Sequence, residues 1–108
     1  MKEAKDKILH QLLTILKAEL KAELKEVILF GSYNSGMHTE NSDFDVLIVL
    51  QNPADWRIKG KIRDLCYEIS LKNDILIDSK IISEFELNHK FWGKHPLYTD
   101  TLKFGLHA

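Results

Sequence analysis

Two aspartates separated by one residue are the side chains of this sequence best suited to chemistry. Asp43 and Asp45 stand at the head of an apolar run that ends at Leu50, and residues 27–50 contain no lysine or arginine to compensate them. Side chains two residues apart project from the same face of a β-strand, so the two carboxylates would lie close together. Mg²⁺ prefers carboxylate oxygens combined with substrate phosphates, and two such ions about 4 Å apart can clamp an in-line phosphoryl displacement. The pair therefore predicts a metal site for phosphoryl chemistry.

A glycine–serine pair lies upstream of the aspartates. Gly31 and Ser32 follow the short apolar run from Val27 to Phe30, where a strand would give way to a turn. A glycine there lets a phosphate approach the backbone, and exposed amides with a serine hydroxyl can hold it. No Gly-Lys-Ser/Thr follows, so this is not the P-loop of ATPases. We expect a different kind of triphosphate-binding turn.

Together these features resemble a known superfamily. A glycine–serine pair after a strand, about ten residues, and then Asp-apolar-Asp opening the next strand is similar to the nucleotidyltransferases that include DNA polymerase β. The brevity of the chain makes it resemble the minimal nucleotidyltransferases in particular, over roughly residues 27–106. The resemblance implies that Gly31, Ser32 and Ser42 hold the phosphates of an NTP, with ATP expected. It also implies that Asp43 and Asp45 bind Mg²⁺, with two ions expected.

The family usually adds a third carboxylate on the next strand, which would bind metal or activate the acceptor hydroxyl. Two candidates, Asp74 and Asp78, are four residues apart and could share a face of a regular strand. We favour Asp78 because it is flanked by Ile77 and by the pair Ile81-Ile82. Asp74 stands at the expected start of the strand, where a turn aspartate is common, and it stays open as the alternative.

The resemblance implies an enzyme that moves AMP from ATP to a hydroxyl of an acceptor. A chain of 108 residues leaves no room for an acceptor domain, so the acceptor would be a second copy or another protein. Minimal members act as antitoxins beside a HEPN-type toxin, and some inactivate that toxin by adding AMP to it.

Two alternatives remain open. The segment Tyr33-Asn34-Ser35 lacks the basic residue that many minimal members carry, which favours a binding module that neutralises a partner by docking alone. The other alternative is a half-domain that becomes active on dimerising through the apolar face of its first helix.

Composition excludes several classes. The chain is 44% hydrophobic and 29% charged, which is typical of one soluble globular domain. Fifteen basic against 16 acidic residues argue against a nucleic-acid-coating protein. No apolar run approaches the roughly 20 residues of a membrane span, and the N-terminus lacks an apolar signal core, so we expect a cytoplasmic protein. A single cysteine excludes an internal disulfide.

The elements that must position the aspartates follow from hydrophobic periodicity. An α/β (α+β) fold is expected, with a small mixed sheet of at least three strands packed with helices. The run from Phe44 to Leu50 is nearly all apolar, so both of its faces should be covered. Ser83 and Glu86 form a capping box that would open a helix toward Trp92. The expected helices are residues 4–25, one opening at Asn52-Pro53, and 97–104; the expected strands are 27–30, 44–50 and 74–82.

Overall fold

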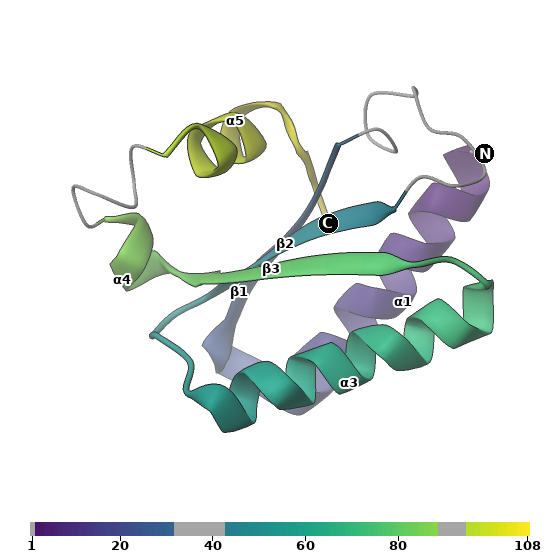
Figure 1. Cartoon of the computed structure of the whole chain (residues 1–108), viewed down its shortest axis with the longest axis horizontal. Helices are drawn as coiled ribbons and strands as arrows, with labels where there is room; N and C mark the ends of the chain where they lie inside the picture. Colours follow the sequence, from purple (N-terminus) through teal and green to yellow (C-terminus); the bar gives the residue numbers. More distant parts are fainter. Residues whose placement is uncertain (1, 32–42, 89–94) are drawn as a thin grey trace.

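The computed structural model describes residues 2–31, 43–88 and 95–108 (Figure 1). It is a mixed α+β fold, as expected, with a four-stranded sheet in the order β3-β2-β1-β4. The strands are β1 (Leu24–Phe30), β2 (Phe44–Leu50), β3 (Ile77–Ser83) and β4 (Leu106–His107). The helices are α1 (Lys2–Leu20), the 3₁₀ turn η1 (Lys21–Glu23), α3 (Trp56–Asn73), α4 (Glu84–Leu87) and α5 (Pro96–Phe104).

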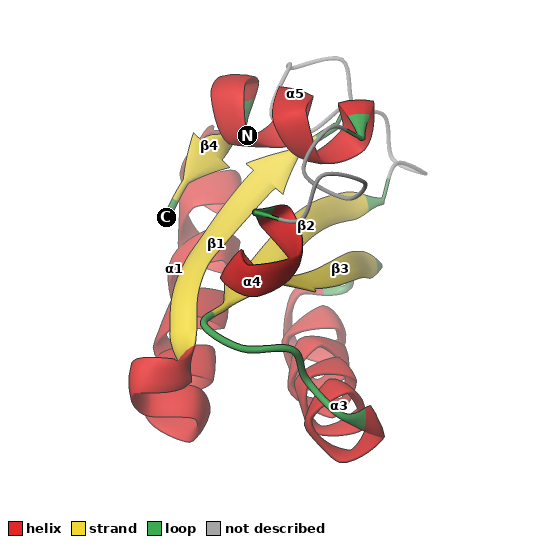
Figure 2. Ribbon diagram, turned by 90° about the vertical axis from the view of Figure 1, so that its left-hand side faces the viewer, coloured by secondary structure: helices red, strands yellow, loops and turns green. Residues whose placement is uncertain are grey.

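The sheet combines antiparallel and parallel pairing. β1 runs antiparallel to β2, and β2 runs parallel to β3 through the crossover helix α3. β4 pairs antiparallel with β1 and lies beside it in Figure 2. The amide of Ala108 extends this pairing by donating to the carbonyl of Val27 at 2.9 Å. The fourth strand was not predicted, because a strand of two residues has no alternation to read.

Helices cover both faces of the sheet. Val46 and Ile48 of β2 belong to a core with α1 and α3, whereas Leu47 and Val49 belong to a second core with residues of α4 and α5. All four side chains are at most 1% exposed, which confirms that both faces of β2 are covered. Burying each such side chain contributes about 1.5–3 kcal/mol, so β2 is the most strongly anchored strand for a site to stand on.

The first helix is shorter than predicted. Its apolar period continues through Leu20 and Leu24, but the helix ends at Leu20 and the chain enters β1 at Leu24. Lys21 adopts a positive φ of 52°, which turns the chain out of the helix. Leu24 still packs against the core, now from a strand, so the same apolar residue serves either conformation.

The second long helix begins three residues later than Asn52-Pro53 predicts. Asp55 is its N-cap, and its Oδ1 accepts from the amide of Ile58 at 3.0 Å. The backbone amide of Asn52 instead donates a hydrogen bond to Oε1 of Glu23, which connects the end of β2 to η1. Asparagine and aspartate are comparable caps, so the tertiary contact decides between them.

The remaining boundaries follow the sequence more closely. The capping box at Ser83 and Glu86 is confirmed, and it turns β3 directly into α4. α4 ends at Leu87, and the continuation expected toward Trp92 falls outside the described residues. α5 spans residues 96–104, one residue longer than predicted, and Gly105 ends it. None of the described helices is long and apolar enough to span a bilayer.

Candidate active site

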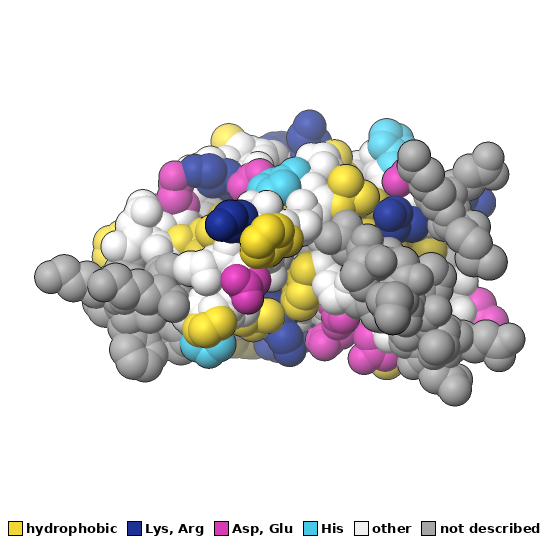
Figure 3. Space-filling model, turned by 90° about the horizontal axis from the view of Figure 1, so that it is seen from above, with side chains coloured by type: hydrophobic (Ala, Val, Ile, Leu, Met, Phe, Trp, Pro, Cys, Tyr) yellow, Lys and Arg dark blue, Asp and Glu magenta, His cyan; other side chains and the backbone are white. Residues whose placement is uncertain are grey.

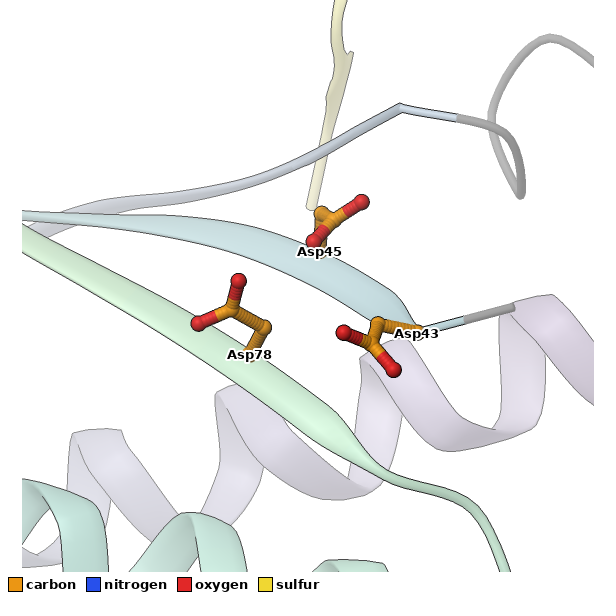
Figure 4. Close-up of side chains that lie close together, drawn as sticks. All are labelled: Asp43, Asp45 and Asp78. Carbon is orange, nitrogen blue, oxygen red and sulfur yellow. The ribbon is translucent and has the colours of Figure 1, made fainter. Parts of the chain in front are cut away.

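Two carboxylates face each other across the parallel pair of strands. Asp45 of β2 and Asp78 of β3 are register partners, and Asp43 directly precedes β2 (Figure 4). Strand alternation directs Asp45 and Asp78 to the face on which Leu47 and Ile82 pack, away from α1 and α3. The three aspartates therefore meet on the sheet face that α4 and α5 cover only in part.

The three carboxylates form a compact acidic cluster. Asp43, Asp45 and Asp78 each offer one oxygen, and these oxygens lie within 4.8 Å of one another. Among the described cations, Lys80 stands nearest, with its Nζ 3.7 Å from Oδ2 of Asp78. In the view from above, acidic side chains gather near the lower margin of this face (Figure 3). One lysine cannot balance three carboxylates, so the cluster keeps an excess of negative charge.

This excess acts on the central carboxyl group. Partial burial raises the pKa of Asp45, and the charges of Asp78 and then Asp43 raise it further. Lys80 acts in the opposite direction and lowers the pKa of Asp45, but the net direction is upward. A bound cation would reverse this, because it favours the ionised form of every ligand around it.

Gly31 lies against the cluster. It adopts a φ of +75°, a conformation that L side chains rarely take, and a Cβ at this position would overlap Oδ2 of Asp45. From the sequence, Gly31 was interpreted as the residue that lets a phosphate approach the backbone. The structure adds a second reason, because the glycine leaves space for the central carboxylate.

The structure distinguishes the two candidates for the third carboxylate. Asp74 closes α3 in a left-handed conformation with a φ of 49°, and its amide donates to the carbonyl of Ser70. It is exposed, and it stands three residues before β3 begins at Ile77. Asp78, not Asp74, is the carboxylate that the fold brings to Asp43 and Asp45.

Ser32 and Ser42, the other residues expected to hold phosphates, lie outside the described residues. Lys80 was not singled out from the sequence. Its position two residues after Asp78 in a strand was the available signal, because that spacing places both side chains on one face.

The donor set suits a hard divalent cation. Three carboxylates converge with an excess of negative charge, and every ligand atom that this cluster offers is a carboxylate oxygen. Mg²⁺ takes such ligands and completes its shell with water and substrate phosphates. Asp43, Asp45 and Asp78 could therefore hold metal ions beside the turn at Gly31, where a phosphorylated substrate can approach.

Comparisons with known proteins agree with this geometry. The family model described as a nucleotidyltransferase domain matches residues 9–98. A Methanocaldococcus jannaschii protein named "Putative protein adenylyltransferase MJ0604" is 36% identical over 91 residues, which cover 83% of this chain and 86% of that protein. A second one from this organism, named "Putative protein adenylyltransferase MJ0141", is 48% identical over 58 residues, covering 54% of this chain and 59% of its own length.

Two solved structures share the fold. One is a mutant of the toxin–antitoxin MntA-HpeT, with a TM-score of 0.61 and 15% identity over 92% of this chain and 70% of that one. The other is a toxin–antitoxin with AMP-PNP, with a TM-score of 0.56 and 18% identity over 89% of this chain and 68% of that one. At these identities the likeness shows a common architecture and leaves the activity to the site.

Proposed function

This chain belongs to the nucleotidyltransferase domain family and is a nucleotidyltransferase, and from that premise we propose that it transfers AMP from ATP to a hydroxyl group of a protein, with Mg²⁺ as its metal. The observation that carries the proposal is the convergence of Asp43, Asp45 and Asp78 beside Gly31. The name "Putative protein adenylyltransferase", which both Methanocaldococcus jannaschii relatives carry, supports AMP as the transferred group and a protein as the acceptor.

Each carboxylate has a proposed role. Asp43 and Asp45 hold metal ions, two being the expected number, and Asp78 joins them as a third ligand. Bound Mg²⁺ supplies charge neutralisation on the phosphates and on the departing pyrophosphate. Gly31, together with Ser32 and Ser42, positions the triphosphate. Catalysis then consists mainly of positioning and electrostatic stabilisation.

The proposed reaction is a single displacement. The acceptor hydroxyl oxygen bonds to the α-phosphorus, the bond from that phosphorus to the bridging oxygen breaks, and pyrophosphate leaves with the bond electrons. The proton of the hydroxyl passes to the carboxylate of Asp78. Asp78 suits this role because it stands on β3, and no strand covers the outer edge of β3 within the described residues.

The acceptor is proposed to be a partner protein of the HEPN toxin type, which makes this chain the antitoxin of the pair. The solved toxin–antitoxin structures that share this fold support a partner of this kind. A second copy of the chain is the other acceptor to test, and the cytoplasm, where ATP is available, is the expected compartment.

The experiment uses ATP labelled at the α-phosphate, Mg²⁺, and the product of the neighbouring gene. Wild type and the matched variant Asp74→Asn should both transfer label to the partner, because Asp74 lies outside the cluster. Asp78→Asn should lose at least about 100-fold in rate, which is the size of a general-base contribution. Equal transfer by Asp78→Asn would remove that residue from the reaction.

The same experiment tests the docking alternative. A binding module transfers no label and neutralises its partner as well with Asp43→Ala as with the wild-type chain. That pair of results would replace the enzymatic proposal. Label that appears on the chain itself, with none on the partner, would identify a second copy as the acceptor.

A further inference from the structure

The outer edge of β3 presents backbone groups that could pair with a further strand. β3 stands at one end of the sheet, so one of its sides faces away from β2 (Figure 2). The amide of Ile77 donates to Oγ of Ser70 on this outer side. Backbone groups alternate in direction along a parallel strand, so the amides of Ser79 and Ile81 also point outward. Within the described residues, neither of these two amides has a hydrogen-bond acceptor.

A strand added at this edge would place side chains beside the acidic cluster. Asp78 and Lys80 are two residues apart on β3, and both project to the face on which the cluster lies. Neighbouring strands lie about 4.7–4.9 Å apart, so a residue opposite Asp78 would stand directly next to its carboxylate. The edge therefore offers a route by which another chain brings one side chain to Asp78.

The opposite face of the same edge offers an apolar contact. A hollow of about 260 Å³ lies between α3 and β3, and its lining includes Tyr67, Leu76 and Ser79. Tyr67 and Leu76 are each 64% exposed, so two large apolar side chains remain mostly unpacked there. Side chains of a strand alternate between its faces, so the residue adjacent to the one beside Asp78 would lie over this hollow. An apolar residue suits that position.

The charges beside the edge favour an acidic residue in the added strand. The side chain of Lys80 is 47% exposed, and its Nζ lies 3.7 Å from Oδ2 of Asp78. A divalent cation at the cluster would share Asp78 and weaken its attraction for Lys80. Opposite charges directly across neighbouring strands attract, so an acidic residue opposite Lys80 would complement it. Arg63, which lines the hollow, adds a second positive charge on the other face.

A second copy of this chain does not supply the side chain that the reaction needs at this edge. If its β3 paired here, it would turn Asp78, Lys80 and Ile82 to the face of the cluster, because these residues share that face of the strand. None of the three has a hydroxyl group. The occupant that fits is therefore an extended segment of a different protein.

We propose that the acceptor protein adds such a segment to the outer edge of β3, as a fifth strand of the sheet, and so places its acceptor hydroxyl beside Asp78. The segment has a hydroxyl residue opposite Asp78, an apolar residue next to it over the hollow, and an acidic residue opposite Lys80. The inference rests on the proposed function, because it takes Asp78 to receive the hydroxyl proton. In strand addition of this kind, main-chain hydrogen bonds give affinity and alternate side chains give specificity.

Amide hydrogen exchange tests strand addition without any variant. The full chain is compared alone and with the product of the neighbouring gene, Mg²⁺ and α,β-methylene ATP, which cannot transfer AMP. In the free chain, the amides of Ser79 and Ile81 should exchange faster than those of Asp78 and Lys80, which face β2. The complex should slow exchange at Ser79 and Ile81 at least tenfold. Unchanged exchange in the complex overturns the inference, and so does slow exchange in the free chain, which shows an edge that is already covered.

Ser79→Pro tests whether the edge positions the acceptor. Proline is tolerated on edge strands where the N–H faces solvent, and the ladder with β2 uses the amides of the alternate residues. The variant should raise the KM for the partner at least tenfold and keep the affinity for α,β-methylene ATP within twofold of wild type. Ser79→Ala keeps the outward amide and is the matched control, with the KM of wild type. An equal KM in Ser79→Pro and Ser79→Ala overturns the inference.

Lys80 tests the charge pattern of the segment. Lys80→Gln should raise the KM for the partner at least threefold, and Lys80→Arg, which keeps the charge, should restore it. An unchanged KM in Lys80→Gln excludes the acidic residue opposite this position.

Failure of the inference is distinguishable from failure of the proposed function. Label transfer to the partner by wild type, with unchanged exchange at Ser79 and Ile81, leaves the enzymatic proposal standing and excludes the edge as the acceptor site. Absence of label on the partner with wild type overturns the transfer to that protein and this inference with it.

Discussion

Removing the charge of Asp45 should stabilise the protein at neutral pH while weakening its metal site. The carboxylate oxygens of the cluster lie within 4.8 Å of one another. Two unit charges at that distance repel by about 0.9 kcal/mol in water and about 3.5 kcal/mol at an effective dielectric constant of 20. Asp45 has two such neighbours and gains some attraction from Lys80. Because the cluster is partly solvated, the relief of repulsion lies between these limits, and we expect Asp45→Asn to raise the free energy of unfolding by about 1–2 kcal/mol.

The pH dependence should carry the same sign. Burial and the neighbouring charges raise the pKa of Asp45 above its ordinary value of 3.8, so the folded state holds this proton more tightly than the unfolded chain does. Stability contributed by the protonated group is therefore lost as pH rises from 3.8 through the raised pKa. Asp45→Asn has no such proton, so its advantage over wild type should grow across that window and level off above it.

Thermal unfolding in EDTA at neutral pH measures the effect. A gain of 1 kcal/mol corresponds to about 4–8 °C in Tm for a domain of this size, so a rise of about 5 °C or more is expected. Asp64→Asn on α3 is the matched control and should leave Tm within about 1 °C. Adding Mg²⁺ at ten times its Kd should raise wild-type stability by about 1.4 kcal/mol and the variant by much less. A variant that melts at or below wild type in EDTA would refute the argument from repulsion.

Three further predictions concern residues around the cluster. Gly31→Ala should lower the free energy of unfolding by about 1–2 kcal/mol, because alanine is strained at the left-handed φ of this position; chemical denaturation measures this loss. The same variant should lower the transfer rate at least tenfold in the labelled-ATP assay, because the added Cβ displaces the carboxylate of Asp45. Ser70→Ala removes the buried hydroxyl that joins α3 to β3 and should lose about 1 kcal/mol in urea unfolding, while transfer per folded molecule is unchanged. A hydrogen bond to Glu26 raises the pKa of His107 above 6.5, so the stability from this pair is present below pH 6.5 and is lost as pH rises through the raised pKa. Glu26→Gln should therefore flatten that part of the plot of Tm against pH. A decline of Tm that is parallel in wild type and Glu26→Gln would contradict this assignment.

The local part of the site could be predicted from the sequence. Asp43 and Asp45 are two residues apart at the head of an apolar run, and strand geometry alone brings their side chains to one face. The buried run after them requires helices on both sides of the sheet, which the structure confirms.

The non-local part could not be fixed in this way. Asp74 and Asp78 are four residues apart and would lie on the same face of a regular strand, so spacing alone cannot decide which of them is the third carboxylate. The choice depends on where α3 ends, and α3 ends at Asp74, which adopts a left-handed conformation and donates a hydrogen bond from its backbone amide to the carbonyl of Ser70. The register that places Asp78 opposite Asp45 joins segments separated by the whole crossover, which no local pattern encodes.

The C-terminal part of the fold was the least predictable. β4 has two residues and depends on a β1 that is already in place. A cavity of about 420 Å³ near β4 is lined both by Phe30 and Gly31 and by residues of α5, which follow more than sixty positions later in the sequence. Periodicity predicted α5 as a helix but contains no information about which strand end it would cover.

The parallel pairing of β2 with β3 also bears on how the chain folds. The connection between these parallel strands is the α3 crossover, so the pair joins segments far apart in the sequence, and closing it brings like charges at Asp45 and Asp78 together across the ladder. Such a non-local step is slow, and repulsion between the aspartates opposes it further. Because Asp45 and Asp78 are register partners, docking β3 onto β2 also brings these two carboxylates of the cluster together. A divalent cation should therefore speed refolding to the extent that both strands are already docked in the transition state.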